Sequence, residues 1–219
     1  MVRGPSRLTG RPGHGARRPA GPYLLNTIKT THVRTMTNPV THIVWGYLLG
    51  RAASPAPRYI FLGMMAGAIM DVDQLVPGLV HHGWVHTPVL ALAVSALLYA
   101  LTRDRLVLWV SLAAMLCHLV LDTVATQHGI MWLWPLSTHE FVIWTVSDLA
   151  ALAVVKVYAF LFPVYWIWHR WREHGESPLA VLDWLDARVP RPVTYGGVAT
   201  FGVAMVAVWW VYYAQILLG

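Results

Sequence analysis

The chain has 219 residues, of which 57% are hydrophobic and only 12% charged, and its net charge is +6. With a mean hydropathy of +0.51, this composition excludes an ordinary soluble domain and favours a polytopic membrane protein. The single cysteine, Cys117, excludes a disulfide framework and a cysteine-rich zinc site. Because the basic residues lie in short stretches between apolar runs, we expect no nucleic-acid partner.

The first 35 residues carry seven Lys or Arg among Gly, Pro, Ser and Thr and show no apolar periodicity. We expect this basic leader to be disordered. Met36 stands directly before the first apolar run, so a second alternative stays open, in which translation begins at Met36. Residues 36–219 are predicted to form one membrane domain, with a metal-motif region at 41–136.

Six apolar segments follow in chain order, and they predict an all-α bundle of about six transmembrane or half-membrane helices. They span roughly residues 40–50, 58–70, 87–102, 106–125, 140–168 and 196–218. The first two would cover only about 16 to 20 Å of a hydrocarbon core of about 30 Å. Their polar ends, His42 and Asp71, are therefore expected at membrane depth. Ser177-Pro178 precedes a short amphipathic stretch that predicts an interfacial helix.

Basic residues orient this set of segments. Lys and Arg gather at 51–58, 103–105 and 170–191, whereas 71–86 and 126–139 contain none. The positive-inside rule places the basic stretches in the cytoplasm and the His/Asp-rich loops on the outer side of the plasma membrane. A first segment that folds back without crossing, with a cytoplasmic N-terminus, is the alternative.

Residues 71–86 contain two carboxylates and three imidazoles, in Asp71, Asp73, His81, His82 and His86. Such groups cost several kcal/mol each when unpaired near hydrocarbon, so a metal ion, a catalytic task or a proton path is the natural reason for them. Capping of a helix by the two aspartates is the simpler alternative. Periodicity does not decide between His81 and His82.

His118 and Asp122 are four residues apart on an apolar run, so on a helix they share one face and can reach a common ion. A plain hydrogen-bonded pair is the alternative, and His42 alone would more often bond to a neighbouring helix. Taken together, however, four separate places on one membrane face supply imidazole and carboxylate. These are ligands of Zn²⁺, Mn²⁺ and Fe²⁺, and they predict a divalent metal site.

The ordered combination of His42, Asp71-Val72-Asp73, His81 to Thr87, His118 with Asp122, and Gly129 to Trp134-Pro135 resembles the YdjM-type family of membrane-bound metal-dependent hydrolases. The resemblance covers roughly residues 41–136. It implies a metal site formed by His42, Asp71, Asp73, His81, His86, His118 and Asp122. It favours His81 over His82 as a ligand, because His82 stands where the family has Arg, and Thr87 stands where it has Ser.

The leading hypothesis is an enzyme that hydrolyses an ester or phosphoester through a water activated by one or two ions, with Zn first and Mn or Fe as alternatives. One of Asp71, Asp73 or Asp122 would act as general base if it is not a ligand. His82, Thr87 and Asp148 are assigned to the substrate. The interfacial position suggests a lipid or lipid-linked phosphate as substrate, with the bilayer as partner.

Two other functions use the same residues. A metal or proton transporter would need a polar path across the membrane, for which the sequence offers little beyond Asp148 and Lys156. We expect Lys156 to point toward the cytoplasm, since it is too far along its segment to pair with Asp148. A non-catalytic scaffold with a structural metal is the third alternative, because no Gly-x-Ser-x-Gly nucleophile motif is present.

Overall fold

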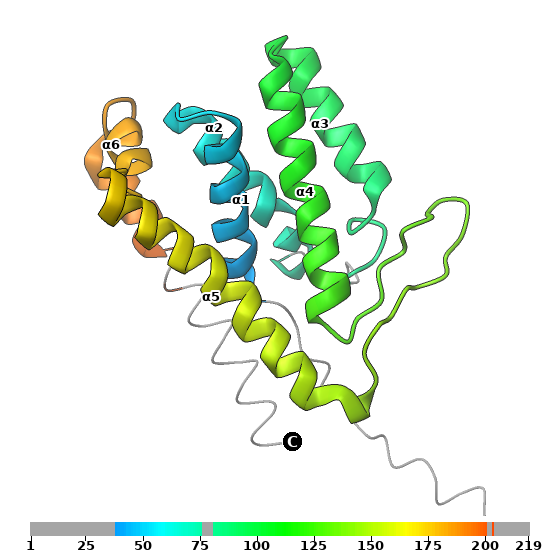
Figure 1. Cartoon of the computed structure of the whole chain (residues 1–219). Coiled ribbons are helices and arrows are strands. Elements are labelled where there is room, and N and C mark those ends of the chain that lie inside the picture. The colour runs from blue at the N-terminus through cyan, green and yellow to red at the C-terminus, as the bar shows by residue number, and fades with distance from the viewer. Residues whose placement is uncertain (1–37, 76–80, 201–202, 204–219) are drawn as a thin grey trace, which may run out of the picture. The chain divides into compact units, whose positions relative to one another are not determined.

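The computed structural model describes residues 38–75, 81–200 and 203 (Figure 1). Regular structure in this part is helical, apart from one isolated β-bridge between Ile130 and Phe141. The predicted all-α class is confirmed. The elements in order are α1 (Pro39–Ala53), α2 (Pro57–Ala68), the 3-10 helix η2 (Ile69–Leu75), α3 (Pro88–Thr102), α4 (Arg105–Ala125), the 3-10 helix η3 (Val146–Asp148), α5 (Leu149–His174) and α6 (Ala180–Asp186). Residues 191–200 are also helical.

The first five predicted segments correspond to α1 to α5, but the membrane-helix count of about six is not confirmed. Two described helices, α4 and α5, are long and apolar enough to cross a membrane, and α3 is a shorter apolar helix. Helix α5 begins at Leu149 rather than near 140, because residues 126–145 form a loop. The basic leader and most of the sixth segment lie outside the described residues.

Helix starts follow from local chemistry. Pro39, Pro57 and Pro88 each open a helix, where a missing backbone N–H costs nothing. The side chain of Asn38 accepts a hydrogen bond from Val40 N at 2.9 Å, in front of α1. Asp104 caps α4 in the same way. The sequence thus sets where α1 to α4 begin.

Backbone contact between α1 and α2 is the closest packing in the fold. A Cβ placed on Gly46 would overlap the carbonyl oxygen of Gly63, and a Cβ on Gly63 would overlap the carbonyl of Gly46. Gly50 meets the carbonyl of Tyr59, and Gly67 meets that of His42, in the same manner. The four glycines are the two small-xxx-small pairs of the sequence, which let helix backbones touch. Gly67 extends this contact to the first histidine of the predicted site.

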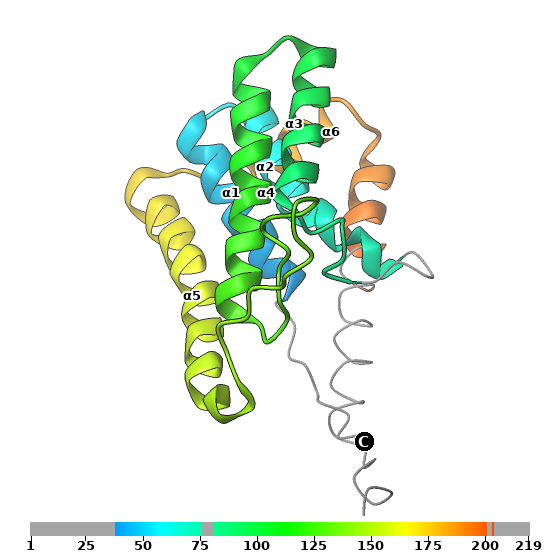
Figure 2. The same cartoon turned by 90° about the vertical axis from the view of Figure 1, so that its right-hand side faces the viewer.

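Helix α4 contacts α1, α2, α3 and α5. It runs side by side with α3, to which a short turn joins it (Figures 1 and 2). Met70, Met115 and Leu119 are among the buried apolar residues between α4 and its neighbours. His118 and Asp122 share this buried helix, so the packing of α4 decides what surrounds them.

Charged groups join helix ends away from the site. Arg51 and Arg170, at the ends of α1 and α5, both bond the carboxylate of Glu176, the former at 2.7 Å. Tyr59 Oη donates to Asp104 at 2.6 Å, which ties α2 to the start of α4. The helix predicted after Ser177-Pro178 is present as α6, which packs on α2 with the Trp184 and Phe61 rings 5.9 Å apart, and its interfacial position stays a prediction. These contacts fix the helix ends that carry the basic residues.

The α1–α2 contact can be tested by adding one methyl group. We expect Gly63→Ala to lower the free energy of unfolding by about 1–3 kcal/mol, because backbone must move to admit the Cβ. Thermal unfolding of the purified protein in detergent measures this. Gly196→Ala is the matched control, since a Cβ there meets nothing within 4 Å. If Gly63→Ala and Gly196→Ala unfolded at the same temperature, the close contact between α1 and α2 would be contradicted.

Candidate metal centre

The centre of the cluster is the carboxylate of Asp122, near the end of α4. His42 Nε2, from the first turns of α1, lies 3.2 Å from Asp122 Oδ1. His118 Nε2, one turn earlier on α4, lies 3.0 Å from Asp122 Oδ2. The His42 and His118 rings stack with centroids 3.7 Å apart. All three side chains are buried, with residue exposures of 1%.

The backbone of α2 orients His118. Its Nδ1 lies 2.7 Å from the carbonyl oxygen of Gly67. Since a carbonyl only accepts, Nδ1 carries the hydrogen and Nε2 presents its lone pair to the cluster. The glycine that lets α2 approach α1 therefore also sets the tautomer of a candidate ligand.

The loop before α3 supplies three further histidines. His82 has a left-handed backbone with φ 63°, which is uncommon for a residue with a Cβ and is often found at functional sites. Its Nε2 lies 3.4 Å from Asp122 Oδ2, and His86 Nε2 lies 3.7 Å from the same oxygen. The His81 and His82 rings are 4.1 Å apart. Periodicity left these two residues as alternatives, and the structure brings both to the cluster.

Asp73, in η2, holds two of these imidazoles. His81 Nδ1 lies 2.9 Å from Asp73 Oδ1, and His86 Nδ1 lies 3.1 Å from Oδ2. This contact turns Nε2 of His86 toward Asp122 and Asp71. Burial of Asp73 opposes its ionisation, but the contacts with His81 and His86 outweigh it and hold the pKa of this carboxyl well below its usual range. Asp73 thus orients imidazoles, and its assignment as ligand or base stays a prediction.

Asp71 is the most accessible carboxylate of the cluster. Its Oδ1 lies 3.9 Å from His118 Nε2 and 4.0 Å from His86 Nε2, and its side chain is 10% exposed. The side chains of Asp73 and Asp122 are 0% and 2% exposed. Asp71 is therefore the carboxylate placed to meet both the cluster and an incoming molecule.

The donor set fits a divalent metal. Three groups of residues each offer ligand atoms that lie within 4.8 Å of one another inside the group. The groups are His81, His82 and His86; His42, Asp71 and His118; and His86, His118 and Asp122. Nε2 of His42, His86 and His118 is buried and, apart from the ion-pair contacts with Asp71 and Asp122 given above, has no hydrogen-bond partner among the described residues. Ligands that share a tetrahedral ion at about 2.1 Å stand about 3.4 Å apart. The cluster's Nε2–Oδ separations, 3.0 to 4.0 Å, bracket that value, so these residues could hold one ion or two.

Charge balance also favours a cation. Asp71, Asp73 and Asp122 bring three carboxylates into a mostly buried cluster. Burial, outweighing the attraction of Asp122, lowers the pKa of His82 to about 2, so this imidazole is neutral at physiological pH. A neutral imidazole adds a ligand without offsetting the carboxylates. Buried carboxylates need nearby positive charge, and a bound divalent metal is one form of compensation that suits this donor set.

The residues predicted to bind substrate have local partners. Thr87 is fully buried, donates to Trp84 O at 2.9 Å and caps α3. Asp148 does not lie inside a long apolar segment as predicted; it precedes α5 and accepts from Thr145 N at 2.8 Å in a capping box. His82 faces Asp122. Substrate contact by the three residues remains a prediction.

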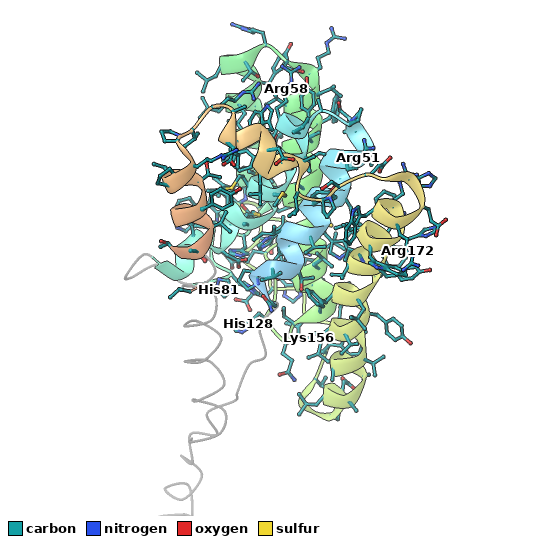
Figure 3. The ribbon with its side chains drawn as sticks, turned by 90° about the vertical axis from the view of Figure 1, so that its left-hand side faces the viewer. Arg51, Arg58, His81, His128, Lys156 and Arg172 are labelled. Atoms are coloured by element: carbon teal, nitrogen blue, oxygen red, sulfur yellow. The ribbon has the colours of Figure 1, made fainter. Side chains whose placement is uncertain are left out.

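His128 is a neighbour of the cluster that was not among the predicted site residues. Its ring lies 4.8 Å from that of His82 and 6.2 Å from that of His81, and Figure 3 shows His81 and His128 at the same end of the molecule. Thr126 Oγ1 donates to Asp122 O at 2.6 Å, and His128 N donates to Thr126 Oγ1. The sequence feature that could have identified His128 as a neighbour of the cluster is its short separation along the chain from Asp122.

A protein-family model described as "YdjM inner membrane protein" matches residues 36–216. The searches of curated proteins and of solved structures gave no match. The match includes every predicted metal ligand and both helices that are long and apolar enough to cross a membrane. Membrane association is thus supported by the family description and by the helices themselves.

Metal content tests the cluster directly. We expect the purified protein to carry a divalent transition metal and His118→Ala to lose most of it, because His118 Nε2 belongs to two of the three ligand groups. Elemental analysis after gentle purification measures the occupancy. His139→Ala, at an exposed position of the loop after α4, is the control and should keep parental content. Unchanged content in His118→Ala would remove the basis for the site.

The variant Asp73→Asn tests whether Asp73 supports metal binding by orienting His81 and His86. Because the amide cannot hold both His81 and His86 as a carboxylate does, we expect metal affinity to fall about 10- to 100-fold. Competition with a chromophoric chelator measures this affinity. Asp183→Asn, on the exposed side of α6, should match the parent. An affinity for Asp73→Asn equal to that of the parent would show that the imidazoles are held by other contacts.

Proposed function

The chain belongs to the YdjM inner membrane protein family, and from this premise we propose that it is a membrane-bound metal-dependent hydrolase of ester or phosphoester substrates. The observation that carries the proposal is the convergence of four imidazole Nε2 atoms, from His42, His82, His86 and His118, on the carboxylate of Asp122. A divalent ion, Zn²⁺ or else Mn²⁺ or Fe²⁺, would supply Lewis-acid activation of water and of the electrophilic oxygen when bound there.

The three carboxylates take different roles in this proposal. Asp122, fully enclosed by imidazoles, holds the ion. Asp73 keeps His81 and His86 in place. Asp71, partly exposed at the cluster edge, accepts the proton of the attacking water as general base. The base role is assigned to the most exposed of the three carboxylates, because a general base must reach the attacking water.

The proposed setting is a multi-pass membrane protein with its site on the non-cytoplasmic side. Arg51 and Arg58 lie toward one end of the described part, and His81 and His128 toward the other (Figure 3). The positive-inside rule assigns the arginine end to the cytoplasm. A site at the outer edge of the bilayer favours a lipid or a lipid-linked phosphate as substrate.

Packing beneath the cluster favours a hydrolase over a transporter. One turn before His118, toward the arginine end, α4 presents the buried Ala114 and Met115. A transporter would need polar groups there to continue the path. The hydrolase needs access from one side only, which this arrangement supplies.

Turnover of a lipid phosphoester by the metal-loaded protein tests the proposal. We expect a chelator to abolish hydrolysis and re-addition of metal to restore it. Asp71→Asn should lower kcat by about 10²- to 10⁴-fold at saturating metal, because the general base is lost. Asp183→Asn is the control and should retain parental kcat. Bound metal without turnover, together with metal flux into proteoliposomes, would replace the hydrolase with the transporter.

A further inference from the structure

Lys156 differs from the other described cationic residues because it lies inside an apolar helix. The described part contains nine Lys and Arg, and eight of them lie at helix ends or in connections. Lys156 instead stands in the first third of α5, within an apolar span. An ionisable residue inside a membrane span is costly, and such residues commonly serve a function, so Lys156 is a candidate for a role at the site.

The position of α5 places Lys156 at the end of the described part that carries the cluster, rather than at the arginine end. Trp45 Nε1, on α1, donates to Ala159 O of α5 at 2.7 Å, which fixes the helix on α1 one turn beyond the lysine. Helix α5 also contacts α4. Lys156 is half-buried. Figure 3 shows it at the same end of the described part as His81 and His128, away from Arg51 and Arg58. Its expected direction toward the cytoplasm stays a prediction.

None of the cluster residues is a Lys or Arg that could hold an anionic substrate. His82, which was assigned to the substrate, is 5% exposed and faces Asp122. An ammonium group has three donors on a flexible stem that lies along apolar surface, so it can hold a phosphoryl oxygen at the hydrocarbon edge.

We propose that Lys156 binds the anionic phosphoryl group of the substrate and thereby makes the enzyme specific for lipid phosphoesters over neutral carboxylic esters. The inference rests on the proposed function. In the reaction a bond forms between water oxygen and phosphorus, and the ester P–O bond breaks. One water proton passes to Asp71, which then gives it to the leaving alkoxide, so that ester and water give phosphate and alcohol and the carboxylate is regenerated. Lys156 keeps its proton throughout and acts as a specificity-determining contact.

Binding of a lipid that cannot be hydrolysed tests this contact. The probes are a long-chain alkyl phosphonate and the alkyl alcohol of equal length, titrated into the full-length metal-loaded protein in detergent. We expect Lys156→Met to weaken phosphonate binding about tenfold or more, the loss of one charged hydrogen bond, and to leave alcohol binding unchanged. Lys156→Arg keeps the charge and should stay within about threefold of the parent.

Arg172→Met, at the far end of the same helix, is the matched control and should bind both probes as the parent does. Metal content and size-exclusion profile establish that each variant is folded. Equal phosphonate binding by Lys156→Met and the parent, or no phosphonate binding by the parent, overturns the proposal.

Turnover separates this proposal from the hydrolase itself. Lysine-dependent phosphonate binding without hydrolysis of any lipid phosphoester would leave the anion site standing and remove the enzymatic function. Hydrolysis of a lipid phosphoester with a KM unaffected by Lys156→Met would leave the hydrolase standing and remove the role of the lysine.

Discussion

The contact between the α1 and α2 backbones is the constraint on which the site depends. Because Gly46 and Gly63 carry no side chains, the two helices touch, and Gly67 meets the carbonyl of His42. The carbonyl oxygen of Gly67 itself accepts a hydrogen bond from His118 Nδ1. A contact made by three glycines therefore sets the distance between two candidate ligands from different helices and the tautomer of one of them.

Buried charge is the second constraint. An apolar bundle that encloses Asp122 among imidazoles must supply a cation or suffer a large desolvation cost. Asp73 orients two imidazoles of the cluster. Its two carboxylate oxygens contact Nδ1 of His81 and Nδ1 of His86, which leaves the Nε2 atom of each ring available to the cluster. The cluster could thus hold an ion with its imidazoles already oriented, which is the preorganisation that the proposed metal catalysis requires.

The two ends of the described part differ in chemistry. One end joins helices through Arg51, Arg170 and Glu176, while the other gathers imidazoles and carboxylates. Lys156 is the cationic residue at the second end, and the proposed role in binding an anionic substrate is drawn from this position.

The sequence by itself determined the helical class and the starts of α1 to α4, because apolar runs and helix caps are local properties, and together with the family resemblance it pointed to the residues of the candidate metal cluster. Tertiary structure decided that His82 joins His81 in the cluster, since a left-handed backbone at His82 follows no helical period. It also decided the late start of α5 and the end of the described part at which Lys156 lies. Each of these depends on contacts between segments far apart in the chain, such as Trp45 with Ala159, which no local pattern encodes.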